Sequence, residues 1–142
     1  MKKLLFVLVA IFTIAVTGCN KNELDITRGY DFTLVMRELP FKLMRYSSTD
    51  IRLRINPEGN YPDTKYTMSF VQYTGNGTLQ NEAGEFLSPN VSYDLNNKIF
   101  VLKYTSYGID DHFLEITVSD NFGHVKKQKV KLLNDDSVDW VK

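Results

Sequence analysis

The sequence offers few side chains that could act as nucleophiles or general bases. Its only histidines are His112 and His124, and its only cysteine is Cys19. Nucleophilic catalysis needs a nucleophile, a base within hydrogen-bond reach and a group that orients the base. Asp110 and Asp111 precede His112, so this segment could supply a base and its orienting group. The alternative is a polar loop that leads into the next strand, with His124 at the flank of a hairpin. We predict no catalytic residue and no enzyme.

The spacings that are typical of zinc sites do not occur: there is no His-x-x-x-His, no Glu-x-x-His and no cysteine pair. Oxygen ligands of the kind that calcium prefers are more plentiful. Those that one end of a sandwich could gather are Asp94, Asp110, Asp111, Asp120 and Asn121. Their spacing matches no EF-hand loop, and aspartate and asparagine also populate ordinary solvated turns. We therefore predict no metal and no other cofactor.

Cys19 follows a segment with the anatomy of an export signal. Lys2 and Lys3 form a positive region, and the 13 residues from 4 to 16 are apolar except for Thr13. A bilayer-spanning helix needs about 20 apolar residues, so the run is too short to remain as an anchor. Residues 16–19, Val-Thr-Gly-Cys, resemble the lipobox of bacterial lipoproteins. We predict a signal peptide over residues 1–19 and lipidation of Cys19, the alternative being an ordinary secretory signal with a chance cysteine.

The remaining chain divides into a short tether, one domain and a tail. Residues 20–29 are polar and predict a tether that reaches at most about 35 Å. Residues 30–133 predict one domain, and residues 134–142 an acidic tail. Without Lys2 and Lys3, 15 basic residues face 17 acidic ones. This near-neutral charge gives no positive electrostatic field that would attract the phosphate backbone of a nucleic acid, so we predict no nucleic-acid partner.

Aromatic side chains are the remaining candidates for a binding surface. Tyr61 and Tyr107 fall in expected loops, and Trp140 lies among the aspartates of the tail. We predict these three residues as a possible interaction surface. Five tyrosines could instead present rings to sugars, namely Tyr61, Tyr73, Tyr93, Tyr104 and Tyr107. Tyrosine is also a favoured strand residue, so part of this set is expected to be structural. No small-molecule substrate is evident.

The elements that must position these residues are predicted by a period of two, which is typical of half-buried strands. The alternating apolar positions are Phe32, Leu34 and Met36; Ile51, Leu53 and Ile55; Tyr66, Met68 and Phe70; Phe100, Leu102 and Tyr104; and Leu114, Ile116 and Val118. A last run, residues 125–133, is rich in lysine, which suits an exposed edge strand because charge discourages aggregation there.

Turn-forming residues separate these runs at short intervals, for example at residues 57–60, 75–77, 88–90 and 120–123. No stretch shows a convincing helical period with caps. About seven short strands with turns every 8–12 residues predict an all-β fold, an immunoglobulin-like antiparallel β-sandwich.

Two resemblances follow from these segments. Residues 102–105 and 114–123, which end in an Asp-Asn-Phe-Gly turn, are similar to the closing strands of PKD-like and related Ig-like domains. A longer series resembles the TraQ family of conjugative transposon proteins from Bacteroidetes. Its segments, together with the lipoprotein signal, are residues 62–67, 75–79, 86–90, 104–106 and 120–123.

The TraQ resemblance implies a non-enzymatic, lipid-anchored envelope protein that is a structural or interaction component of a conjugative transfer apparatus. Its implied partners are a membrane, through the lipid, and other conjugative transfer proteins. Its implied location is the cell envelope, with the outer membrane as the expected membrane and the leaflet left open. The alternative from a different class is a cell-surface glycan-binding Ig-like module.

Overall fold

The computed structural model describes residues 29–40 and 42–135. The predicted signal peptide, nearly all of the predicted tether, Cys19 and Trp140 lie outside the described residues. Within the part that is described, no helix is long and apolar enough to cross a membrane.

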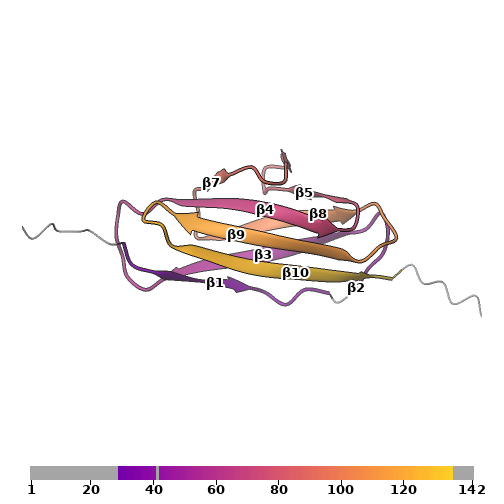
Figure 1. Ribbon diagram of the computed structural model, residues 1–142, viewed down its shortest axis with the longest axis horizontal. Helices are drawn as coiled ribbons and strands as arrows, with labels where there is room; N and C mark the ends of the chain where they lie inside the picture. The colour runs from indigo at the N-terminus through magenta and orange to yellow at the C-terminus, as the bar shows by residue number, and fades with distance from the viewer. Residues whose placement is uncertain (1–28, 41, 136–142) are drawn as a thin grey trace, which may run out of the picture.

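Ten strands in the described residues form two five-stranded sheets that pack face to face (Figure 1). The first sheet has the order β1-β3-β8-β5-β6, with β1 Phe32–Met36, β3 Ser48–Pro57, β8 Ile99–Ser106, β5 Gly77–Gln80 and β6 Phe86–Leu87. The second has the order β2-β10-β9-β4-β7, with β2 Lys42–Leu43, β10 Val125–Asn134, β9 His112–Asp120, β4 Tyr66–Thr74 and β7 Tyr93–Leu95. All of the pairings are antiparallel except that of β2 with β10. The predicted all-β sandwich is confirmed.

The predicted alternation determines which side chains enter the core. In β3 and β8, for example, Ile51, Leu53, Phe100 and Tyr104 are buried while Arg52 is exposed. The two sheets enclose one apolar core, made by Phe32, Leu43, Ile51, Leu53, Ile55, Tyr66, Met68, Phe70, Leu79, Leu87, Phe100, Leu102, Tyr104, Leu114, Ile116, Val118, Val130 and Leu132. A strand with a period of two can bury only one face, so this pattern fixes the register of each pairing.

Four short strands were not among the runs that the sequence indicated. They are β2, β5, β6 and β7, each of two to four residues, which is too short to show a periodicity. The lysine-rich β10 pairs with β9 along one side. On its other side, β2 pairs with it only at Leu133 and Asn134. Most of β10 is therefore a sheet edge, as its lysines predicted.

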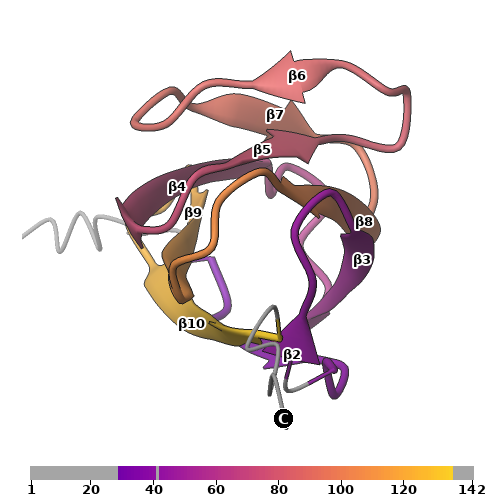
Figure 2. The same cartoon turned by 90° about the vertical axis from the view of Figure 1, so that its right-hand side faces the viewer.

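The long axis of the sandwich separates two ends, each closed by loops (Figures 1 and 2). At the end that we call the entry end, residue 29 leads into β1, and the loops 58–65 and 121–124 close the sheets. At the opposite end, which we call the tip, lie the loops 44–47, 75–76 and 107–111 and the end of β10. Residue 29, the first described residue, therefore lies at the end of the sandwich opposite the tip.

Candidate interaction surface at the tip

Backbone hydrogen bonds join the loops of the tip into one surface. The Tyr46 N–H donates to the Ser106 carbonyl (2.8 Å), and the Tyr107 N–H donates to the Asn76 carbonyl (2.8 Å). The Thr74 hydroxyl donates to the carbonyl of Asp111 (2.9 Å). Three loops that are distant in the sequence are therefore held side by side.

This surface exposes four large apolar side chains. Met44, Tyr46 and Ile109 are 55%, 71% and 61% exposed, and Tyr107 is 40% exposed. The rings of Tyr46 and Tyr107 meet edge to face with centroids 6.3 Å apart, and the Arg45 guanidinium lies 5.2 Å from the centre of the Tyr46 ring. Apolar groups gathered on loops around an aromatic pair, with a cation beside them, are typical of protein-binding surfaces.

Tyr46 also has an unusual backbone. Its φ is +63°, in the left-handed region that bulky residues rarely occupy. The other described non-glycine residue with positive φ is Asn90, and asparagine tolerates this conformation because its short side chain bonds locally. Tyr46 is 71% exposed and its ring contacts Tyr107 and Arg45, so the backbone strain at this position motivates the hypothesis that the ring has a function.

A buried polar network lies directly beneath the tip. His112 is the first residue of β9 and has no exposed surface. The Tyr104 hydroxyl lies 2.8 Å from its Nδ1, and the Ser106 hydroxyl lies 2.8 Å from its Nε2. Gln72 donates from Nε2 to the oxygen of Tyr104 (3.1 Å) and to the Gly75 carbonyl (2.8 Å).

These contacts assign the protons. Because Gln72 donates to the Tyr104 oxygen, the Tyr104 proton is directed to Nδ1 of His112. The ring then carries its proton on Nε2 and donates to Ser106, which donates in turn to the carbonyl of Gly108 (3.3 Å). Each member of the network is satisfied while the ring stays neutral. Burial lowers the pKa of His112 against the opposing effect of Asp110 and Asp111, and burial raises the pKa of Tyr104 to about 12.

The interpretation of residues 110–112 as one polar loop is wrong for His112, since this residue begins β9 inside the core. Ser106 and His112 lie at the distance of a nucleophile and its base. Both have no exposed surface, so a substrate could not reach them without an opening of the sandwich. The pair therefore has a structural role in the folded protein. No sequence spacing indicated Ser106, because β8 and the start of β9 meet only in the fold.

Gly75 packs directly against His112 of this network, where a larger residue would not fit. Its φ is +83°, and a Cβ placed on it would come within 2.2 Å of His112 Nδ1 and within 3.0 Å of the His112 Cα. A side chain at this position would require both backbone strain and displacement of the histidine. The predicted turn at residues 75–77 thus has a packing function as well as a conformational one.

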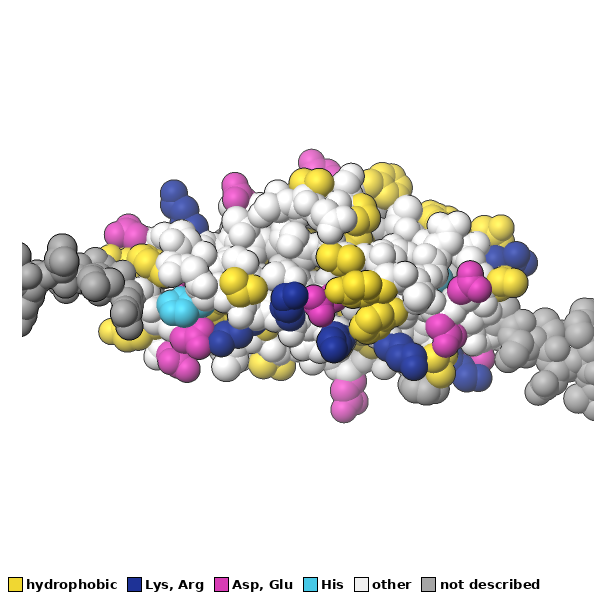
Figure 3. Space-filling view, in the orientation of Figure 1, with side chains coloured by type: hydrophobic (Ala, Val, Ile, Leu, Met, Phe, Trp, Pro, Cys, Tyr) yellow, Lys and Arg dark blue, Asp and Glu magenta, His cyan; other side chains and the backbone are white. Residues whose placement is uncertain are grey.

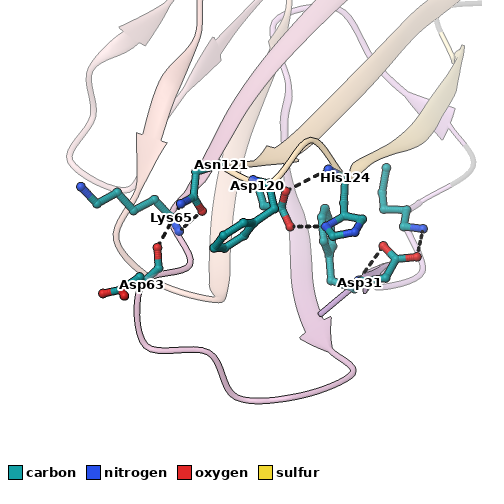
Figure 4. A network of polar contacts seen from close by, with 9 residues as sticks. Asp31, Asp63, Lys65, Asp120, Asn121 and His124 are labelled. Atoms are coloured by element: carbon teal, nitrogen blue, oxygen red, sulfur yellow. Dashed lines mark hydrogen bonds and ion pairs between the residues drawn. The ribbon is translucent and has the colours of Figure 1, made fainter. Parts of the chain in front are cut away.

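The entry end is held by a different polar network (Figure 4). Asp120 Oδ1 accepts hydrogen bonds from the N–H groups of Phe122 and His124, both at 2.9 Å, and its Oδ2 lies 2.7 Å from His124 Nδ1. Asn121 accepts from the Lys65 N–H (2.8 Å) and donates to the Asp63 carbonyl (3.1 Å). The turn at residues 120–123 therefore binds the β9–β10 hairpin to the β3–β4 loop, with His124 at the hairpin flank as predicted.

The aromatic residues predicted from the sequence do not converge. Tyr107 is at the tip, whereas Tyr61 packs edge to face on Phe122 at the entry end (5.2 Å). Tyr104 is in the core. Tyr73 stacks on Phe113 (5.1 Å) at the outer face of the second sheet, where Figure 3 shows hydrophobic side chains beside basic and acidic ones. Tyr93 lies on β7, at the edge of the second sheet, so the five tyrosines do not form a row. Met44, Tyr46 and Ile109 were missed because nothing in the sequence shows that their loops meet.

The acidic residues considered as calcium ligands are also dispersed. Asp110 and Asp111 lie at the tip, Asp120 and Asn121 lie at the entry end, and Asp94 lies on β7. In the described part of the chain, no three histidine, cysteine, aspartate or glutamate side chains form a group that could hold a metal ion.

Comparisons with known proteins identify related chains. The model of a family described as TraQ conjugal transfer protein matches residues 2–135. A search of the curated proteins found no match.

Three solved structures from Bacteroides are similar over most of their length. A conjugative transposon lipoprotein from Bacteroides eggerthii is 31% identical, with a TM-score of 0.69 and coverage of 72% of this chain and 97% of that one. A lipoprotein from Bacteroides thetaiotaomicron is 31% identical, with a TM-score of 0.68 and coverage of 82% and 89%. A conjugate transposon protein from Bacteroides vulgatus is 34% identical, with a TM-score of 0.66 and coverage of 78% and 90%.

Proposed function

Because the chain belongs to the TraQ conjugal transfer family, we propose that it is a lipid-anchored, non-enzymatic part of a conjugative transposon transfer apparatus, with the tip as its contact to a partner protein of that apparatus. The lipid would be carried by Cys19, in the envelope and on the outer membrane. Two similar proteins are described as lipoproteins, which supports the anchor. Anchoring restricts the domain to two dimensions and raises its local concentration near membrane partners.

The observation that carries this proposal is the exposure of Tyr46 in a strained backbone at the end opposite residue 29. Tyr46 and Tyr107 present two amphipathic rings, and Met44 and Ile109 of the same two loops are also exposed. Tyrosine is enriched at binding hot spots because it contributes large contact area with little loss of conformational entropy. A protein partner with an apolar pocket would fit this surface.

The test uses donor cells in which the gene is deleted and then restored with variants. Tyr46→Asn together with Tyr107→Asn removes both rings, and asparagine suits the left-handed backbone at residue 46. We expect transfer frequency to fall toward that of the deletion strain while the protein remains folded and membrane-bound. Phe86→Asn is the matched control, because Phe86 is 66% exposed on β6, outside the tip.

The anchor is tested separately by Cys19→Ser. We expect this variant to lose its lipid, leave the membrane fraction and reduce transfer. Deletion of the gene with no change in transfer frequency would contradict the proposed role. Normal transfer by the Tyr46→Asn, Tyr107→Asn protein would contradict only the assignment of the tip as the contact surface.

A further inference from the structure

The outer face of the first sheet gathers three of the five arginines of the sequence. Arg52 and Arg54 alternate outward along β3, and both are exposed. The chain after β1 adds Arg37, whose N–H donates to the carbonyl of Arg52 at 3.0 Å. Arg37 and Arg52 are therefore cross-strand neighbours of like charge, and such a pair destabilises a sheet.

The acidic residues beside these arginines, Glu38 and Asp50, do not balance their charge. Asp50 lies 3.7 Å from Arg52, in a pair whose side chains are each about half exposed, and exposed pairs of this kind contribute little to stability. Within the described residues, neither Glu38 nor the other two arginines form an ion pair. Lys103 on β8, opposite Asp50, adds a fourth positive charge. The face therefore has an excess of positive charge, which favours a ligand of negative charge.

The arginines border a groove with apolar walls. Its volume is about 420 Å³, and its lining includes Val35 and Ile99 beside all three arginines. Val35 and Ile99 lie on either side of Arg54 in the sheet, and they are 50% and 54% exposed. Exposed aliphatic groups next to guanidinium groups suit a ligand whose own charges are carried on apolar stems.

The type of basic residue narrows the chemistry of that ligand. The exposed basic residues of β10, in the second sheet, are lysines at positions 127, 129 and 131. An ammonium is a strongly hydrated point charge, whereas a guanidinium is a planar fork that binds a carboxylate through two parallel hydrogen bonds. The first sheet is therefore better suited than the second to bind carboxylates in a fixed geometry.

The spacing of the arginines favours an extended polypeptide. Arg52 and Arg54 are two residues apart in β3, so their Cα atoms are about 6.6 to 6.8 Å apart. In any extended chain, the side chains of residues i and i+2 leave the same face with that same separation. Glutamates at positions i and i+2 of such a chain can therefore each meet one of the two arginines, with their methylene groups on the aliphatic walls.

We propose that this groove is a second binding surface, which takes an extended acidic segment of a partner protein with carboxylates at alternate positions. One carboxylate lies on Arg54, between Val35 and Ile99, and the next lies between Arg37 and Arg52. The second contact also relieves the repulsion between Arg37 and Arg52, so binding recovers what their proximity costs the free protein. The groove shares no residue with the tip, so this inference does not depend on the proposed function.

The test compares two labelled peptides of identical composition and charge. The first has alternating acids, Thr-Glu-Thr-Glu-Thr-Glu-Thr, and the second has the same residues in blocks, Glu-Glu-Glu-Thr-Thr-Thr-Thr. The full chain is purified in non-ionic detergent, and fluorescence anisotropy measures the binding of each peptide at low salt. We expect the alternating peptide to bind severalfold more tightly than the block peptide, because only the former matches the spacing in β3. High salt should weaken its binding, since screening weakens ion pairs.

Two variants with the same loss of charge locate the binding. Arg52→Gln with Arg54→Gln should weaken binding of the alternating peptide by about tenfold or more, since hydrogen bonds to charged groups are lost. Both side chains are exposed, so the sheet should keep its circular-dichroism spectrum. Lys129→Gln with Lys131→Gln removes two exposed charges from β10 and should leave binding unchanged.

Several outcomes would overturn the inference. These are no saturable binding of the alternating peptide at submillimolar protein, equal binding of the two peptides, or equal losses in the arginine and lysine variants. Displacement of the alternating peptide by dioctanoylphosphatidylglycerol at a lower concentration than by unlabelled peptide would assign the face to a lipid surface instead. Self-association that the arginine variant abolishes would assign it to a second copy of the chain.

Discussion

The two histidines of this chain occupy opposite ends of the same sandwich and are held in opposite ways. His112, beneath the tip, has no exposed surface and lies between the hydroxyl groups of Tyr104 and Ser106. His124, at the entry end, is partly exposed and lies 2.7 Å from the carboxylate of Asp120. One network is built from neutral groups and the other around a carboxylate.

Access to water explains this difference. An ion pair in the core would lose the hydration of both charges, which is seldom recovered in full. Hydroxyl groups satisfy a neutral imidazole without that loss. At the entry end, the carboxylate of Asp120 is itself buried but accepts from two backbone N–H groups and contacts the ring of a partly solvated histidine. A buried network of neutral groups tolerates little change, whereas water can replace the ring of a histidine that is partly exposed.

Truncation of each histidine to alanine should give the largest difference in stability between the two ends. His112→Ala should lower the free energy of unfolding by about 4 kcal/mol, because it opens a cavity and leaves two buried hydroxyl groups without their partner. His124→Ala should lower it by about 1 kcal/mol, the value of one hydrogen bond at a site that water can enter. Urea denaturation followed by far-UV circular dichroism measures both. Equal losses at the two sites would contradict the comparison.

Two glycines with positive φ test how tightly the region around His112 is packed. Gly75→Ala should lower the free energy of unfolding by about 3 kcal/mol, through backbone strain and overlap with His112. Gly84→Ala is the matched control: Gly84 has a φ of +82°, close to that of Gly75, but a Cβ there meets nothing within 4 Å. It should therefore cost only about 1 kcal/mol.

The double variant Gly75→Ala, His112→Ala separates overlap from strain. Removal of the ring eliminates the contact with Nδ1 and leaves the tight contact of 3.0 Å with the Cα of residue 112, so the combined loss should be smaller than the sum of the single losses by about 1 kcal/mol. Strict additivity would show that Gly75 is required for its backbone alone.

The two ends also differ in how far the sequence predicts them. The turn at residues 120–123 is local: Asp120 and His124 are four residues apart, so composition alone indicates the hairpin and the place of His124. The network of His112 is assembled from β4, β8 and the start of β9. Its members come into contact only when the strands pair, so their spacing along the chain does not predict the contacts.

The candidate surface at the tip follows the same rule. Tyr107 is predictable as an exposed loop aromatic, but its neighbour Tyr46 precedes β3 and becomes its neighbour through the pairing of β3 with β8. The alternating residues of β3, β4, β8 and β9 are predictable because burial of one face acts on each strand separately. The short β6 and β7 depend on their partner strands and have no pattern of their own.

The smallest expected effect is the pH dependence of the free energy of unfolding that His112 causes. Burial lowers the pKa of His112 in the folded protein, whereas an unfolded histidine titrates near 6.5. As the pH falls below about 6.5, the unfolded chain binds a proton that the folded protein does not, so the free energy of unfolding decreases. Between pH 6.5 and pH 5.5 the loss from this residue can be at most about 1 kcal/mol, the limit for a buried ring that stays neutral throughout the window. We expect it to appear in the difference between the unmodified protein and His112→Gln, measured by urea denaturation at each pH.

A carboxylate of the entry end serves as the control for this window. A hydrogen bond from Lys126, followed by one from the Phe32 N–H, lowers the pKa of Asp31 below its ordinary value of 3.8. Its contribution to stability is present above that value and is lost only as the pH falls through the lowered pKa. Asp31→Asn should therefore leave the profile between pH 6.5 and pH 5.5 unchanged and alter it only under more acidic conditions. If the free energy of unfolding of His112→Gln changed with pH as steeply as that of the unmodified protein in that window, His112 would not be a neutral ring excluded from water.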